Sequence, residues 1–529
     1  MDVCRNRLRL DRPDTGSVAV NSAAPAGYDV VVIGSGLGGL STAALLARAG
    51  LHVAVVERSE HAGGYAQAFR RGSYLFDPAI HFTMDAGPGG FTPAMLAHLG
   101  VSDQVTFVPT QHTYRASYPD LLVEAVPGRQ AFLEAHQRMF PADADGLARL
   151  FDMRQTLFAQ LAALPQKVGA RGLADAMAAA PLVFRYRMST LNDVLSEYLT
   201  DPRCSAAIGT IWPYVGSPPS RMSFLLFNQM LETLHAGSYY ALGSFQTLAD
   251  ALVSAVGHHG GDVLLGSEVT RIVIDGDRAA GVEIAGGRVL GARAVVSNAD
   301  AYQTFGELVG WNVLPENLRR RLDRSRLSPS AFALYGVLHA DPVEMGLTHE
   351  NFVFTTWDHD QTWTDIQTAR PGGIWVSVPT MVDPSLAPQG THLATVTSLA
   401  PARADGTWKD VRADYTKLLL DAVEQGIPGL KDAFELVDVA TPDTLNRFTR
   451  NRGGAAYGWE NIPSQTASKR LAHRTPLDGL FLSGHWAEEG TSSLRVLTSG
   501  RATAAMVAAD LGHPGSVPDF GGPSFLTQA

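Results

Sequence analysis

A glycine-rich turn between an apolar run and a helical pattern is the feature that most constrains this chain. Residues 28–34 read YDVVVIG, a continuous apolar run typical of a strand buried on both faces of a parallel sheet. Gly34, Gly36 and Gly39 then have the spacing G-x-G-x-x-G. Their missing side chains permit the tight turn, the approach of a pyrophosphate and close helix–strand packing, respectively.

The segment after the turn has the pattern of a helix. Apolar residues recur with helical spacing between Leu40 and Ala47, and Gly50 stands where a left-handed cap would end the helix. The N-terminus of this helix, with Gly38 beside it, would direct its partial positive charge at a bound phosphate.

A second expected strand, Val53–Val56, ends in Glu57. An acid at this place accepts hydrogen bonds from the ribose hydroxyls of a dinucleotide. Arg58 follows it directly and is a second candidate cofactor contact, although Glu57 would disfavour the 2′-phosphate of NADP. Strand, turn, helix, strand and acid together predict a site for FAD or NAD.

Two further motifs carry a resemblance to a known family. A second glycine pair, Gly63-Gly64, follows Glu57 closely, and residues 76–82 read FDPAIHF. This order resembles the FAD-binding start of the phytoene desaturase, carotenoid isomerase and retinol saturase superfamily. In that family the Gly-Gly turn runs beside the FAD phosphates. FDPAIHF is similar to the Phe-Asp-x-Gly-x-His variant of retinol-saturase-like members, with Ala79 where those have glycine.

The far end of the chain resembles the closing FAD motif of the same family. Residues 480–486 read LFLSGHW, which indicates a strand ending in Gly484, and an apolar helix is expected over Ala502–Leu511. The resemblance implies that Gly484, His485 and Trp486 contact the flavin end of the cofactor. Many relatives have Gly-Asp where this chain has Gly484-His485, and an imidazole can still donate to an oxygen.

A third segment lies between these two. Short strands are expected over 262–265, 269–274, 281–284 and 294–296. By resemblance, the backbone of Val269 meets the adenine. The three segments that resemble the family's FAD-binding motifs occur in the same order along this chain, and this favours FAD over NAD. The sequence has no second G-x-G-x-x-G after a strand, so electrons are expected to pass to an external acceptor or donor, which could be oxygen, a quinone or a carrier.

The expected fold class is α/β, with a Rossmann-type FAD-binding domain assembled from three segments and an α+β substrate-binding domain. The FAD-binding domain is predicted from residues 28–125, 237–300 and 471–515, the substrate-binding domain from 126–236 and 301–470, and tails at 1–27 and 516–529.

The resemblance implies a FAD-dependent oxidoreductase, in which flavin N5 exchanges a hydride with a carbon–carbon bond of an apolar polyene or isoprenoid, as a desaturase or saturase. His81 is the candidate catalytic or orienting group, and Tyr457 and Trp486 could stack on the ring. The alternatives are a flavin-dependent cis/trans isomerase of a polyene, an amine or amino-acid oxidase, and a lipid-carrying escort protein on the same fold.

Composition narrows the partners and the location. The net charge of −10 argues against nucleic acid, and the two cysteines, Cys4 and Cys204, give no disulfide framework. No run approaches the roughly 18 apolar residues of a membrane span. A cytoplasmic protein, with at most peripheral contact with a membrane, is expected. Asp358–Asp360 and the pair His258-His259 lack the further ligands of a metal site, so no metal is expected.

Overall fold

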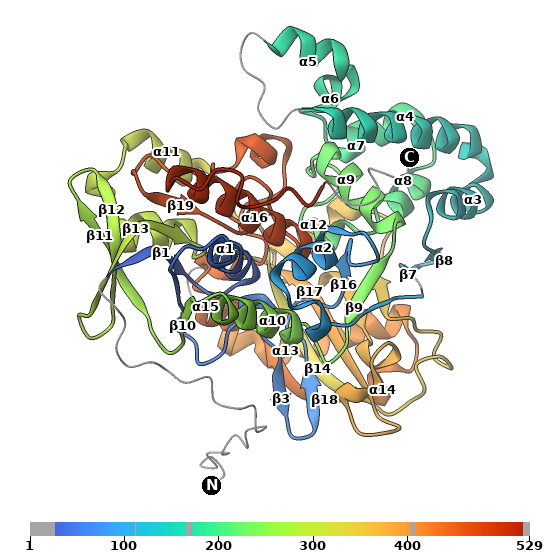
Figure 1. Ribbon diagram of the computed structural model, residues 1–529. Helices are drawn as coiled ribbons and strands as arrows, with labels where there is room; N and C mark the ends of the chain where they lie inside the picture. Colours follow the sequence, from blue (N-terminus) through green and yellow to red (C-terminus); the bar gives the residue numbers. More distant parts are fainter. Residues whose placement is uncertain (1–26, 112, 165–171, 403–407, 522–529) are drawn as a thin grey trace.

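The computed structural model describes residues 27–111, 113–164, 172–402 and 408–521. Two seven-stranded sheets, each with helices packed on it, form the framework of the molecule (Figure 1). Most of the two predicted tails, 1–27 and 516–529, lies outside the described residues. The described helices include none that is long and apolar enough to cross a bilayer.

The first sheet is built around the strand that precedes the glycine turn. β1 (Tyr28–Ile33) runs parallel to β2 (Val53–Val56) on one side and β13 (Val289–Ser297) on the other. Every residue of β2 is buried, and so is every residue of β1 except Asp29, as the apolar runs predict. The remaining strands are β10 (Asp262–Leu264), β11 (Val269–Asp275), β12 (Arg278–Ile284) and β19 (Leu480–Leu482). Strands from all three expected segments therefore share one sheet.

Three helices from distant parts of the chain pack together beside this sheet (Figure 1). α1 (Leu37–Arg48) contacts both α10 (Gln246–His258) and α16 (Ser493–Asp510). The last helix was predicted to begin at Ala502, and this prediction is wrong, because α16 begins at Ser493. Ser492 accepts a hydrogen bond from the Arg495 amide as the N-cap, and Gly500 lies inside the helix where it contacts α1.

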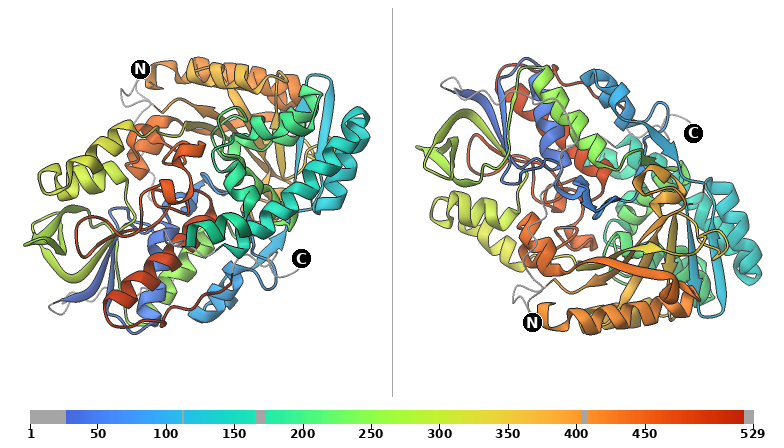
Figure 2. Two further views of the ribbon diagram at one scale, coloured as in Figure 1. Left: turned by 90° about the horizontal axis from the view of Figure 1, so that it is seen from above. Right: turned by 90° about the horizontal axis from the view of Figure 1, so that it is seen from below.

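The second sheet is mixed and has the strand order β18-β14-β17-β16-β15-β7-β8. Its strands are β7 (Tyr114–Tyr118), β8 (Leu121–Ala125), β14 (Ser330–Leu338), β15 (Glu350–Val353), β16 (Gly372–Ser377), β17 (His392–Ala400) and β18 (Phe434–Ala440). α13 (Trp408–Gly426) packs along its outer face through buried apolar side chains (Figure 2). β7 and β8 were predicted within the cofactor segment 28–125, but β7 pairs with β15 and β8 pairs with β7, so both strands belong to the second sheet.

A group of helices between residues 129 and 235 packs at the other end of the second sheet (Figures 1 and 2). Its members are α3 (Arg129–Met139), α4 (Ala144–Ala163), α5 (Leu173–Ala179), α6 (Pro181–Tyr186), α7 (Leu191–Tyr198), α8 (Pro202–Gly209) and α9 (Phe224–His235). The helices share a buried apolar cluster with α1 and the first sheet, so the core is continuous across both parts.

Candidate cofactor and substrate site

The glycine turn between β1 and α1 has no room for side chains. Gly34 has a φ of +90°, which only glycine adopts easily, and Gly36 is the N-cap of α1. A Cβ atom on Gly38 would lie 2.8 Å from Gly484 Cα, and one on Gly39 would lie 2.2 Å from the Gly34 carbonyl oxygen. Gly39 thus allows close helix–strand packing as predicted, and Gly38 allows the first glycine turn to approach the Gly484 turn.

The second glycine pair lies directly against this turn. Gly63 donates its N–H to the Ser35 carbonyl at 3.0 Å, and Gly36 and Gly63 form a parallel β-bridge. Gly63 and Gly64 have φ values of +125° and +58°. A Cβ atom on Gly64 would lie 3.0 Å from Gly36 Cα. The two turns therefore form one backbone cradle that a side chain at either position would obstruct.

Glu57 follows β2 and faces the same cavity. One of its carboxylate oxygens accepts hydrogen bonds from the Ser35 N–H and hydroxyl at 2.8 Å each, and the other accepts from the Ser59 N–H at 2.8 Å. The carboxylate thus fixes the glycine turn, and its remaining lone pairs are available to a ligand. Arg58 donates to the carbonyl oxygens of Arg447 and Phe448. Binding of ribose by Glu57, or of any ligand group by Arg58, stays a prediction.

The third segment meets the cradle through Val269 and Asn298, which both line the cavity. Val269 is the first residue of β11. Asn298 follows β13 and donates from Nδ2 to the Ser483 carbonyl at 3.0 Å, so it links the middle segment to the Gly484 turn. No sequence pattern singles out Asn298, since a single amide side chain after a strand is common.

The closing motif contributes one cavity residue and one core residue. His485 lines the cavity, and its Nε2 atom has no hydrogen-bond partner among the described residues. Burial, with a smaller contribution from Arg470, lowers the pKa of His485 to about 3, so the imidazole is neutral at pH 7. Trp486 is 2% exposed, packs edge-on against Trp459 and donates to Asn451 Oδ1 at 3.3 Å. Trp486 is not among the residues that line the cavity, and its contact with the cofactor stays a prediction.

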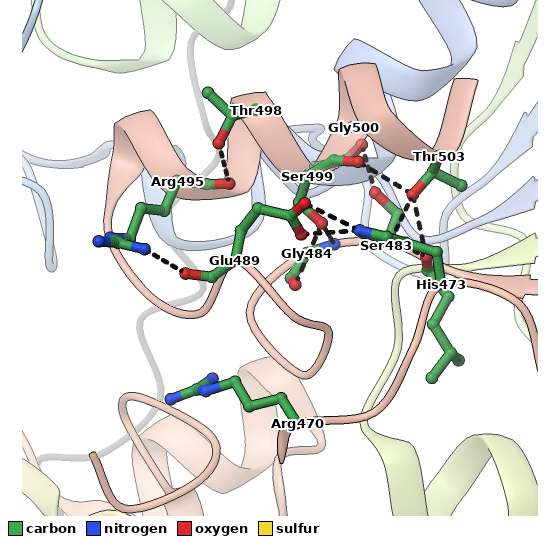
Figure 3. A network of polar contacts seen from close by, with 12 residues as sticks. Arg470, His473, Ser483, Gly484, Glu489, Arg495, Thr498, Ser499, Gly500 and Thr503 are labelled. Atoms are coloured by element: carbon green, nitrogen blue, oxygen red, sulfur yellow. Dashed lines mark hydrogen bonds and ion pairs between the residues drawn. The ribbon is translucent and has the colours of Figure 1, made fainter. Parts of the chain in front are cut away.

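A buried ionic network supports the Gly484 turn (Figure 3). His473 Nε2 lies 2.9 Å from Glu489 Oε1, and its Nδ1 lies 3.0 Å from the Leu482 carbonyl, which can only accept. Burial lowers the pKa of His473, but Glu489 and Leu482 together raise it above its usual value, so a charged pair forms.

Two arginines complete the same network (Figure 3). Arg495 donates to the Glu489 carbonyl at 2.8 Å, and Arg470 donates to the His485 carbonyl at 2.6 Å. Burial, then repulsion by Arg495, lowers the pKa of Arg470 to about 9. The sequence reasoning missed both arginines and His473, because single charged residues in a loop carry no pattern.

A cavity of about 1150 Å³ joins the cradle to the helical group. Ligand pockets for drug-sized molecules have about 300–1,000 Å³, so this cavity has room for a dinucleotide and more. Its far part is lined by apolar side chains, among them Phe82, Phe158, Leu161, Ile211, Leu226, Met230 and Leu234. The side chains of His81 and Tyr457 also line the cavity. The Asp358–Asp360 segment has structural roles instead: buried His359 accepts a hydrogen bond from Trp212, and Asp358 caps a helix.

The residues present fit FAD. The paired glycine turns leave backbone exposed for phosphates, Glu57 follows the second strand, and His485 Nε2 is an unpaired polar atom in the lining of the same cavity. The fold and this site define a FAD-dependent oxidoreductase.

Comparison with known proteins identifies the family. Residues 37–508 match the family model described as flavin containing amine oxidoreductase, so the chain belongs to that family. The chain is 27% identical to a lycopene-forming phytoene desaturase of a Paracoccus strain, over 93% of this chain and 99% of the relative. It is 26% identical to prolycopene isomerase 2 of an Oncidium hybrid, over 93% of this chain and 85% of the relative. The resemblance to the phytoene desaturase and carotenoid isomerase superfamily is confirmed.

A solved structure agrees with the fold. An oxidoreductase from Methanosarcina mazei superposes with a TM-score of 0.61 at 20% identity, covering 89% of this chain and 99% of that protein. The predicted α/β class is confirmed. Among the described residues there is no group of three or more His, Cys, Asp or Glu side chains arranged to hold a metal ion.

Proposed function

We propose that this FAD-dependent oxidoreductase adds or removes hydrogen across a carbon–carbon bond of a long apolar polyene or isoprenoid. The observation that carries the proposal is the continuity of the cavity, which runs from the glycine cradle into the apolar part lined by α4 and α9. Bound FAD would supply hydride exchange at its ring. The apolar walls would position the substrate and exclude water.

The residues proposed to hold FAD are those of the cradle and its margins: Gly34, Gly36, Gly38, Glu57, Arg58, Gly63, Gly64, Val269, Gly484 and His485. All of them except Gly484 line the cavity, and Gly484 lies against Gly38. Neutral His485 would donate or accept through Nε2 at the flavin end. An oxygen, quinone or protein carrier would exchange electrons with the reduced cofactor from outside.

An apolar substrate must come from a membrane or a carrier, and we propose peripheral contact of the helical group with a bilayer. Leu173 and Met177 on α5 are 46% and 47% exposed, and Met188 after α6 is also exposed. α5 and α6 project from the body of the molecule (Figure 1). They follow α4, whose C-terminal residues Leu161 and Ala162 line the cavity.

Anaerobic mixing of the FAD-loaded enzyme with phytoene in liposomes tests the reaction. Loss of the oxidised flavin absorbance with formation of a longer polyene supports dehydrogenation. A reduced enzyme that converts prolycopene to another isomer without net oxidation supports the isomerase, which the similarity to prolycopene isomerase favours as the second candidate. Bleaching by primary amines but not by phytoene would overturn the proposal in favour of an amine oxidase.

A further inference from the structure

One cluster of polar side chains interrupts the apolar wall of the cavity and is not explained by cofactor binding. It consists of His81, Tyr214, His349, Glu350 and Ser377, of which His81, Tyr214 and Ser377 line the cavity. Glu350 is the first residue of β15 and is paired in register with Ser377 at the end of β16. The cluster is therefore held by the second sheet rather than by the glycine cradle.

Glu350 is the centre of the cluster and is only 1% exposed. Its Oε2 atom accepts hydrogen bonds from the Tyr214 hydroxyl at 2.6 Å and the Ser377 hydroxyl at 3.1 Å. Its Oε1 atom lies 2.9 Å from His81 Nδ1 and 3.3 Å from His349 Nε2. Neither Oε1 nor His81 Nδ1 has an aligned hydrogen-bond partner among the described residues. Their 2.9 Å contact is therefore a close carboxylate–imidazole pair, which a small rotation of the His81 ring would turn into a hydrogen bond.

The protons of the two histidines follow from their partners. His349 Nε2 lies 2.6 Å from the His81 carbonyl oxygen, which can only accept, so His349 carries its proton on Nε2. Burial raises the pKa of Glu350, but the neighbouring His81, His349 and Tyr214 together bring it below the usual value. An ionised carboxylate beside Nδ1 favours the His81 tautomer with its proton on Nδ1, which leaves Nε2 with a free lone pair.

The His81 ring is part of an aromatic box. Its centroid lies 5.1 Å from those of Phe82 and Tyr214 and 6.0 Å from that of Trp375. The side chain is 19% exposed, and it lines the cavity. The titratable groups around it are Glu350, His349, Tyr214 and, at longer range, Asp77.

The box is continuous with the wall that carries His485. The Tyr457 hydroxyl donates to the carbonyl of Pro213, the neighbour of Tyr214, at 3.0 Å. Tyr457 is followed by Gly458, on which a Cβ atom would lie 2.8 Å from the His485 ring. A short chain of contacts thus links the carboxylate–imidazole pair to the expected flavin end of the site.

Desaturation of a carbon–carbon bond needs a group that accepts a proton. One C–H bond breaks with both electrons, and this hydride goes to FAD. The adjacent C–H bond breaks and releases a proton, while its electron pair becomes the second bond of the new alkene. Apolar walls hold water poorly, so a side chain that lines the cavity is the group best suited to accept that proton.

We propose that His81 is the catalytic base that accepts this proton on Nε2, and that Glu350 is a positioning residue that orients the ring and stabilises the resulting imidazolium. In the saturation direction the imidazolium returns the proton and the reduced cofactor returns the hydride. The inference rests on the proposed carbon–carbon chemistry and deepens it. Tyr214 and Ser377 keep Glu350 ionised and in place.

The test compares the FAD-loaded wild type with His81→Gln, Glu350→Gln and the control His258→Gln, which changes an exposed histidine at the end of α10. Anaerobic flavin bleaching by phytoene is followed from pH 5 to 9. His81→Gln should retain FAD and bleach at least about 100-fold more slowly, the usual scale of base catalysis. The control should match the wild type.

Glu350→Gln keeps the volume of the side chain but removes its charge, so it tests whether Glu350 acts on His81 through its charge or only packs against it. Loss of the carboxylate lowers the affinity of His81 for a proton, so the rise of the bleaching rate with pH should move to lower pH by about one unit or more. The apparent pKa of His81 is also measured without substrate, from the pH dependence of its modification by diethyl pyrocarbonate, read by mass spectrometry. It should be lower in Glu350→Gln than in the wild type.

The outcomes are distinguishable. A wild type that phytoene does not bleach counts against the proposed function, and the diethyl pyrocarbonate titration still tests the pair. Equal His81 pKa values in the wild type and Glu350→Gln, or wild-type bleaching by a FAD-loaded His81→Gln, overturns the inference and leaves the proposed function standing.

Discussion

At the scale of single residues, Gly38 shows how closely the first glycine turn approaches the Gly484 turn. A Cβ atom on Gly38 would lie 2.8 Å from Gly484 Cα and 3.1 Å from the Gly484 nitrogen, and backbone atoms cannot turn away as a side chain can. Gly38→Ala should therefore destabilise the protein by about 1–3 kcal/mol, as over-packing does, and weaken FAD binding. Chemical denaturation and the flavin absorbance of the purified protein measure the two effects.

Gly291→Ala is the matched control, because a Cβ atom on Gly291 would meet no heavy atom within 4 Å. It should leave FAD content unchanged. If Gly38→Ala also keeps full FAD content and stability, the prediction is wrong, and the close approach of the two turns is not required for FAD binding.

Asp77 gives a second residue-level prediction, on pH. Its carboxylate accepts hydrogen bonds from the Tyr240 hydroxyl and the Phe245 N–H, yet burial raises its pKa from 3.8 to about 7. Between pH 4 and 7 the folded protein thus holds a proton that the unfolded chain releases, so stability falls as the pH rises through this window.

Asp77→Asn should remove that slope. From pH 5 to pH 8 the variant should gain about 3 kcal/mol of stability relative to the wild type, since the wild type loses about 1.4 kcal/mol for each pH unit between 5 and 7. Urea denaturation of the FAD-loaded proteins at both pH values measures the difference. The exposed Asp103 supplies the control, Asp103→Asn, and equal gains in both variants would contradict the assignment to Asp77.

At the scale of elements, the contact between α1 and α16 depends on a glycine in the middle of a helix. A Cβ atom on Gly500 would lie 1.9 Å from Ser41 Oγ and 2.7 Å from the Gly38 carbonyl oxygen. The Thr42 hydroxyl also donates to the Gly500 carbonyl at 3.2 Å. Because α1 begins at the cofactor turn and α16 ends the last segment, this contact aligns both with the sheet.

Gly500→Ala should separate the two helices and cost about 1–3 kcal/mol despite the better helix propensity of alanine. Gly257→Ala in α10 is the control, because a Cβ atom there would meet nothing within 4 Å, and it should be neutral or slightly stabilising. Thermal unfolding of the two variants compares them. A Gly500→Ala protein as stable as the control would mean that the helices can separate without cost.

At the scale of the whole molecule, FAD should act as a structural partner because its cavity is lined by all three segments and by the helical group. Binding to the folded state alone adds about 2.7 kcal/mol at a free concentration of 100 times Kd. The unfolding midpoint of the apoprotein should therefore rise on addition of FAD. FMN, which lacks the adenosine half, should raise it less, and equal shifts with both ligands would contradict the roles proposed for Glu57 and Val269.

The first sheet could be predicted from the sequence, whereas most of the second sheet could not. β1 and β2 are short apolar runs beside glycine turns, a local pattern that specifies a buried parallel strand. β7 and β8 lie inside the predicted cofactor segment 28–125, yet β7 pairs with β15, more than 200 residues away, and β8 pairs with β7. Such pairing depends on packing between distant segments, which local periodicity does not encode.

The site divides in the same way. The sequence by itself determined the backbone features of the cofactor site, since Gly34, Gly36 and Gly63 are required where a side chain cannot fit. Only the tertiary structure placed Glu350 beside His81, which lies 269 positions earlier in the sequence, and placed the Trp486 side chain in the core. The steric requirements of a turn are local, so they can be recognised in the sequence. A charged pair between distant residues forms only when the tertiary fold brings the two side chains together in a buried position.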